Sequence, residues 1–185
     1  MRRLVVLLIM LASVFVLAPA VAHAEQRYTE SFESGLGGWV PASDDRLPSW
    51  SVTRSPERPF DGTWGLRYDL NGQQDDGTVW VQRRFPVAPN LTVTVEVSFW
   101  VWSDGVAIGG WPVVAYAGAL DPKTESDFTR VGTLNRWVGW KEFRHKVQVQ
   151  TGKTVAPTVT VGFGLTVDWE VVRADYFDLV TVTIA

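Results

Sequence analysis

Residues 91–103 read LTVTVEVSFWVWS, and this segment decides the fold. Its odd-numbered side chains from Leu91 to Val101 are apolar, whereas the even-numbered ones from Thr92 to Trp102 are polar or tryptophan. Successive side chains of a β-strand point to opposite faces of a sheet, so this alternation predicts a strand with one face in the core. No part of the chain shows an equally clear helical period.

The same alternation recurs on both sides of this segment. It predicts eight further strands, over Tyr28–Glu33, Trp50–Arg54, Thr63–Leu70, Thr78–Val87, Trp111–Gly118, Val138–Gln150, Thr158–Val167 and Tyr176–Ile184. Turn-forming pairs such as Asn71-Gly72 and Asp104-Gly105 separate them. Half-buried strands at this spacing predict an all-β fold, an antiparallel β-sandwich of two sheets. The longest loop is expected over Asp121–Arg136, with room for one short helical turn.

The first 24 residues have the features of a secretory signal. Arg2 and Arg3 precede an apolar run over Leu4–Leu17, and the segment ends in Ala22-His23-Ala24. A positive start, an apolar middle and a small-x-small end predict cleavage after Ala24. We therefore expect a secreted single domain over residues 25–185. An uncleaved membrane anchor is the alternative, because the apolar run approaches the length of a membrane span.

Charge and cysteine content narrow the possible partners. The whole chain has 17 Lys and Arg against 20 Asp and Glu, and Arg2 and Arg3 belong to the predicted signal. An acidic mature chain without a basic cluster makes nucleic acid or an anionic membrane an unsuitable partner. The chain has no cysteine and only two histidines, of which His23 lies in the signal. Disulfides, thiol catalysis and a zinc site are therefore excluded.

Ten tryptophans are the most informative side chains for function. Trp100 and Trp102 share strand parity with Glu96, and Trp80 shares parity with Gln82 and Arg84, on the polar side of each strand. Indole rings beside polar groups are suited to sugars, because the C–H faces of a sugar stack on them and its hydroxyls need hydrogen-bond partners. These six residues are the predicted ligand site. The alternative is that the indoles lie under a loop such as 121–136.

Four motifs carry a family resemblance. They are Ser31–Trp39 (SFESGLGGW), Asp61–Leu66 (DGTWGL), Trp140–Phe143 (WKEF) and Tyr176–Val180 (YFDLV). Their order and spacing resemble the jelly-roll carbohydrate-binding modules of the family-4/9 and family-22 type, which are galactose-binding-like sandwiches, and more distantly the meprin/A5/mu domains. The resemblance implies jelly-roll topology and covers nearly the whole mature chain.

The resemblance also implies a structural calcium ion. The matching candidates for its ligands are Glu30 or Glu33, Asp61 and Asp178. Asp178 shares parity with Val180 and is expected on the inward side, where an unpaired carboxylate is costly. Calcium, which prefers hard oxygen ligands, would offset that cost. An ion pair with Arg27 or Arg173 would do the same.

The sequence offers little for catalysis. His145 shares parity with apolar neighbours, and the remaining candidates are the carboxylates Glu96 and Glu142, the minimum set for glycoside hydrolysis. The sequence therefore predicts a secreted, non-catalytic, lectin-like module that binds a polysaccharide or oligosaccharide. An extracellular protein-interaction or assembly domain is the main alternative, since exposed tryptophan is also common in protein interfaces. A small glycan-cleaving enzyme is the lesser one.

Overall fold

The computed structural model of the chain describes residues 24–71, 73, 76–106, 111–169 and 171–185. All but the last residue of the predicted signal peptide lies outside these ranges, so its cleavage and the secretion of the protein stay predictions. In the part of the chain that the structure describes, no helix is long and apolar enough to cross a membrane.

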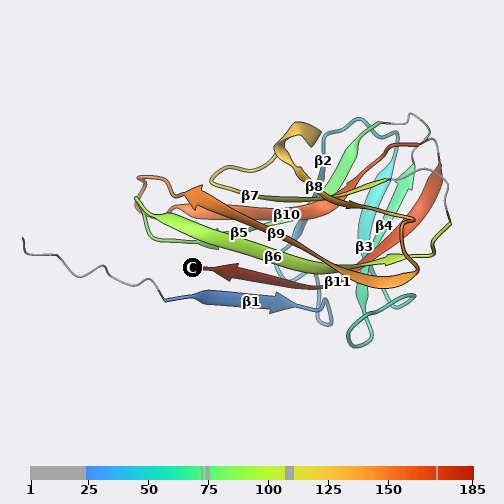
Figure 1. Ribbon diagram of the computed structural model, residues 1–185, viewed down its shortest axis with the longest axis horizontal. Coiled ribbons are helices and arrows are strands. Elements are labelled where there is room, and N and C mark those ends of the chain that lie inside the picture. The colour runs from blue at the N-terminus through green and yellow to red at the C-terminus, as the bar shows by residue number, and fades with distance from the viewer. Residues whose placement is uncertain (1–23, 72, 74–75, 107–110, 170) are drawn as a thin grey trace, which may run out of the picture.

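Two antiparallel sheets pack face to face as a β-sandwich, as Figure 1 shows. The six-stranded sheet has the order β3 (Trp50–Ser55), β4 (Gly65–Asn71), β11 (Val172–Ile184), β6 (Thr92–Ser103) and β9 (Gly139–Gln150), with β1 (Gln26–Glu30) also beside β11. The five-stranded sheet has the order β2 (Val40–Ser43), β5 (Thr78–Pro86), β10 (Thr158–Thr166), β7 (Pro112–Gly118) and β8 (Thr129–Thr133). The prediction of a jelly-roll β-sandwich is confirmed.

Several details differ from the predicted strands, and β1 ends at Glu30 rather than at the predicted Glu33. β2 and β8 were not expected, and β8 lies inside the segment 121–136 that was predicted to be a loop. Both are short strands that pair with a single neighbour, so their sequences carry no long alternation. β11 begins at Val172, four residues before the predicted Tyr176, because its first half pairs with β4. The expected helical turn is present as a short 3-10 helix over Glu125–Asp127.

The core lies between the two sheets and is built from the inner faces of their strands. The apolar side chains Val93, Val95, Val97, Phe99 and Val101 of β6 are at most 1% exposed, as their alternation predicts. The ring of Phe99 stacks on the ring of Phe163 from the other sheet, with centroids 4.7 Å apart. Such contacts fix the two sheets against each other, so side chains of the opposite parity must point outward on both sides of the sandwich.

A β-bulge in β11 changes the expected position of Asp178. The register shifts between Asp178 and Thr181, and Leu179 within the bulge has a positive φ of 43°. As a result Asp178 lies opposite Trp100 on the outer side of the sheet, whereas Val180 is in the core. The prediction that Asp178 points inward with Val180 is therefore wrong, because a bulge adds a residue and breaks the period of two.

Candidate functional site

The predicted ligand residues lie on opposite sides of the sandwich. Trp80, Gln82 and Arg84 come from β5 of the five-stranded sheet, whereas Glu96, Trp100 and Trp102 come from β6 of the six-stranded sheet. Both sets point away from the core, so the expected parity is correct. They do not share one groove, however, and the prediction that Gln82 and Arg84 flank Trp100 and Trp102 is wrong. Alternation within a strand says nothing about which sheet the strand joins.

On the six-stranded sheet, a loop covers the two tryptophans of β6. Phe60, from the loop between β3 and β4, stacks on Trp100 with ring centroids 4.0 Å apart and an interplanar angle of 15°. The guanidinium carbon of Arg58 lies 4.7 Å from the ring centroid of Trp102, and Trp140 packs edge-on against the same indole at 6.0 Å. Trp100 and Trp102 are therefore half-buried rather than open platforms. We call Phe60, Trp100, Trp102 and Trp140 the aromatic cluster.

A polar hollow adjoins the aromatic cluster, and ion pairs join three of its lining residues, Glu96, Glu142 and Arg144. Arg144 donates to Glu142 at 2.7 Å and to Glu96 at 3.3 Å, and Lys146 lies 3.3 Å from Glu96. The hydrogen bond from Lys146 is the main cause that lowers the pKa of Glu96, and Arg144 adds to it. A glycosidase needs one carboxyl group whose pKa is raised so that it can act as an acid. Glu96 has the opposite shift, so it does not have the property that such an acid requires.

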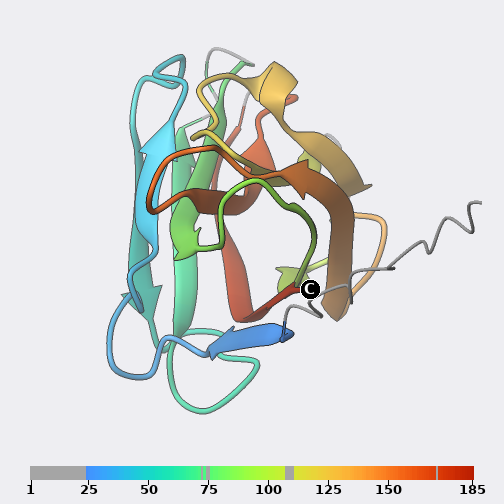
Figure 2. The ribbon, with the colours of Figure 1, turned by 90° about the vertical axis from the view of Figure 1, so that its left-hand side faces the viewer.

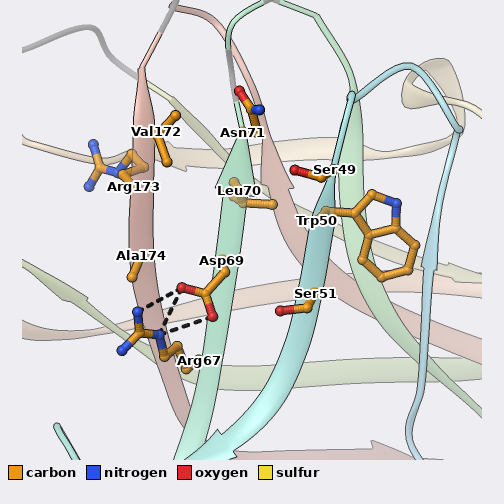
Figure 3. Close-up of a pocket in the computed structure, with 10 residues that line it drawn as sticks. All are labelled: Ser49, Trp50, Ser51, Arg67, Asp69, Leu70, Asn71, Val172, Arg173 and Ala174. Atoms are coloured by element: carbon orange, nitrogen blue, oxygen red, sulfur yellow. Dashed lines mark hydrogen bonds and ion pairs between the residues drawn. The ribbon is translucent and has the colours of Figure 1, made fainter.

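A second hollow on the same face is drawn in Figure 3. Asp69 stands on its floor and accepts two hydrogen bonds from Nε of Arg67, at 2.8 and 3.0 Å. The small side chains of Ser51 and Ala174 flank this carboxylate and leave space above it, while the indole of Trp50 points away from it. The hollow therefore has fixed polar groups but presents no aromatic face beside them.

On the five-stranded sheet, Trp80 is sealed from solvent. It is only 1% exposed, because Phe128, which lies between the 3-10 helix and β8, packs on its ring with centroids 5.0 Å apart. Its Nε1–H donates to Oε1 of Gln82 at 2.7 Å, which satisfies the buried indole and fixes the orientation of the amide. The prediction that Trp80 presents its ring to a ligand is therefore wrong, and the covering loop is the reason.

Beyond Trp80, hydrogen-bonding groups line the outer face of the five-stranded sheet. Arg84 is 64% exposed in its side chain and donates from Nε to Asp121 at 2.9 Å. Thr160 donates to the same carboxylate oxygen at 2.8 Å, and Tyr116 donates to the carbonyl of Leu120 at 2.7 Å. Arg84 is the first cause that lowers the pKa of Asp121, so this carboxylate is ionised and held in one orientation.

Two adjoining hollows meet at Arg84. Gln82, Gly38 and Val40 line one of them, and Tyr116, Asp121, Lys123, Thr158 and Thr160 are among the residues that line the other. We call the two together the five-stranded groove. The strand pattern predicted Gln82 and Arg84 as ligand residues but did not indicate Tyr116 or Asp121. The alternation of Tyr116 with Ala115 and Ala117 in β7 could have indicated its outward position, whereas Asp121 comes from a loop without a period.

Three of the four predicted calcium ligands, Glu30, Glu33 and Asp178, accept hydrogen bonds from backbone amides. Oε1 of Glu33 accepts from the amides of Thr63 and Trp64, both at 2.8 Å. Oδ2 of Asp178 accepts from the amides of Phe60 and Asp61, at 2.7 and 3.0 Å. Glu30 accepts from the amide of Phe32, and Asp61 is itself exposed.

These hydrogen bonds offset the cost of an unpaired carboxylate, which was the reason to expect calcium at Asp178. Burial raises the pKa of Asp178, and the three amides that bond to it, on Asp61, Phe60 and Leu179, act in the opposite direction. Within residues 24–185, apart from the undescribed positions, no group of three or more histidine or acidic side chains could hold a metal ion. In this arrangement the four residues do not fit a calcium site, and calcium binding stays a prediction.

No protein-family model matches the chain, and no curated protein matches its sequence. Solved structures do share its fold. The C-terminal family 22 carbohydrate-binding module of Clostridium thermocellum Xyn10B matches with a TM-score of 0.52 and 17% identity, over 85% of this chain and 92% of that one. The CBM22-1 xylan-binding domain of Paenibacillus barcinonensis Xyn10C matches with a TM-score of 0.53 and 15% identity, over 88% and 97%.

A third match is the K1 cleaved adhesin domain of Lys-gingipain from Porphyromonas gingivalis W83. Its TM-score is 0.54 at 14% identity, over 85% of this chain and 97% of that domain. The predicted resemblance to family-22 modules is thus confirmed at the level of the fold. At these identities the likeness does not define a ligand or its site, because unrelated sites occur on shared scaffolds.

Proposed function

We propose that the protein is a non-catalytic carbohydrate-binding module and that the five-stranded groove binds its glycan. The observation that carries this proposal is the position of Arg84, an exposed cation between two hollows lined by hydroxyl, amide and carboxylate groups. Sugar hydroxyls need such alternating donors and acceptors. The same fold in a xylan-binding domain supports the ligand class without defining the sugar.

Each polar group has a defined role in this proposal. Because Oε1 of Gln82 already accepts from Trp80, the NH2 group of the amide is left to donate to a hydroxyl. Arg84 donates from the centre of the groove, and Asp121 accepts from hydroxyls through its remaining lone pairs. The half-buried ring of Tyr116 supplies an apolar side against which a sugar C–H face can pack. Trp80 supports the groove from below and makes no contact with the ligand.

The experiment that tests this proposal compares two arginines. Arg84 and Arg144 are 64% and 61% exposed, each is paired with a carboxylate, and they lie on opposite outer faces. The purified protein and the variants Arg84→Ala and Arg144→Ala are titrated with a panel of soluble polysaccharides that includes xylan, by affinity electrophoresis and calorimetry. Loss of a charged hydrogen bond to the ligand should weaken binding about tenfold or more in Arg84→Ala. Arg144→Ala should bind like the wild type.

The opposite pattern would move the site to the six-stranded sheet. That version keeps Trp100, Trp102 and Glu96 as ligand residues, and it requires the loop to withdraw Phe60 from Trp100. Binding would then weaken in Arg144→Ala and Trp102→Ala, with Arg84→Ala unaffected. If the wild type binds no member of the panel, carbohydrate binding is refuted. The alternative of a protein-interaction domain, which would use the aromatic cluster, then becomes the leading one.

A further inference from the structure

Arg54, near the end of β3, binds the turn after β1 through its guanidinium. Nε of Arg54 donates to the carbonyl of Phe32 at 2.6 Å, and its terminal NH2 donates to the carbonyl of Glu33 at 2.5 Å. The planar guanidinium thus holds two successive carbonyl oxygens at once. Phe32 needs this support, because its positive φ of 61° is unfavourable for a bulky residue.

The same turn binds the loop between β3 and β4 through the carboxylate of Glu33. Glu33 accepts from two successive amides of the loop, those of Thr63 and Trp64, and these bonds are the first causes that lower its pKa. The guanidinium of Arg54 lies 4.5 Å from the ring centroid of Trp64 and attracts the Glu33 carboxylate. In Figures 1 and 2 the turn after β1 and the loop between β3 and β4 lie side by side.

A second carboxylate completes the arrangement on the other side of the loop. Asp178, in the bulge of β11, accepts from the successive amides of Phe60 and Asp61. The loop that places Phe60 on Trp100 is therefore held by two carboxylates, each bonded to a pair of adjacent amides. These two carboxylates, Glu33 and Asp178, are among the four residues that the sequence offered as calcium ligands.

We infer that Arg54 takes the place of the structural cation, so that this end of the sandwich is stable without calcium. Calcium needs six to eight oxygen ligands, drawn from carboxylates and carbonyls. Here the guanidinium binds the two carbonyls of the turn, and amide hydrogens bind the carboxylate oxygens of Glu33 and Asp178. Amides that point at the carboxylates present positive charge where a calcium ion would have to approach. Arginine, which stays protonated at all ordinary pH values, supplies a permanent cation.

Thermal unfolding with and without calcium tests this inference. We expect the melting temperature of the wild type in about 5 mM calcium chloride to equal that in chelator, to within about 1 °C. Arg54→Ala should lower the melting temperature by roughly 5 °C in both conditions, since two charge-assisted hydrogen bonds are lost. Arg58→Ala is the matched control, because Arg58 lies in the loop between β3 and β4 but contacts aromatic rings rather than the turn after β1. It should change the melting temperature by less than about 2 °C.

A further variant keeps the test decisive if Arg54→Ala does not fold. Arg54→Lys keeps the charge but lacks the fork that reaches both carbonyls, so it should melt between the wild type and Arg54→Ala or, if the latter is unfolded, below the wild type. A wild type whose melting temperature rises by several degrees in calcium would overturn the inference. So would an Arg54→Ala protein as stable as the wild type. Neither result depends on whether the five-stranded groove binds a glycan.

Discussion

The two outer faces of the sandwich cover their tryptophans to different degrees. On the five-stranded sheet, Phe128 seals Trp80 to 1% exposure, and the indole N–H is satisfied by Gln82. On the six-stranded sheet, Phe60 stacks on Trp100 but is itself 38% exposed, and the indoles below it stay half-buried. The first arrangement is an extension of the core, whereas the second is a surface cluster tied down by a loop. Removal of a tryptophan should therefore lower the free energy of unfolding by different amounts on the two faces.

The largest effect is expected at Trp80. Removal of a fully buried indole leaves a cavity and exposes Phe128, which should lower the free energy of unfolding of Trp80→Ala by about 4 kcal/mol. Trp102→Ala removes a half-buried ring and should cost about half as much. Urea denaturation followed by circular dichroism measures both. Equal losses in the two variants would contradict the difference between the faces.

The ion pairs of the molecule also differ in position, because the pair of Arg173 and Asp175 lies inside the sandwich whereas others lie on its outer faces. Arg173 and Asp175 come from the inward-facing positions of β11, and the Asp175 side chain is 1% exposed. Burial raises the pKa of Asp175 to about 6, and the nearby Arg173 opposes this shift. Since the folded pKa exceeds the unfolded value, the folded state binds more protons between about pH 4 and 6. The free energy of unfolding should therefore fall as pH rises through that window, by up to about 3 kcal/mol.

The measurement is a melting curve at pH 5 and at pH 7. Desolvation lowers the pKa of His145, which acts in the opposite direction over the same range, so the effect of Asp175 is the difference between the wild type and Asp175→Asn, which cannot ionise. Relative to Asp175→Asn, the wild type should lose melting temperature from pH 5 to pH 7. Arg144→Ala on the outer face should keep this loss, because its carboxylate partners are solvated. The same pH dependence in the wild type and in Asp175→Asn would show that Arg173 fully offsets the burial of Asp175.

Strand alternation predicted the sandwich well because burial imposes a period of two on every long strand. The apolar run of β6 and the outward parity of Trp100 and Trp80 follow directly from it. Coverage of the indoles by the segment 121–136 was the stated alternative, and the packing of Phe128 on Trp80 confirms it for that residue. The covering residues themselves could not be predicted, since Phe60 and Phe128 lie in segments without a period. The bulge at Asp178 and the separation of Gln82 from Glu96 onto different sheets depend on long-range pairing, which a local pattern does not specify.

The smallest effect is expected where a covering ring is removed from the surface cluster. Phe60→Ala leaves Trp100 in place on its strand and removes a stacked partner that is already partly solvated, so it should lower the free energy of unfolding by about 1 kcal/mol. Phe128→Ala is the matched change on the other face, and it should cost more because it opens the buried indole of Trp80 to water. Denaturation curves give both values. If Phe60→Ala costs as much as Phe128→Ala, the loop on the six-stranded sheet belongs to the core as fully as the loop over Trp80, and its withdrawal to admit a ligand would be too costly to occur.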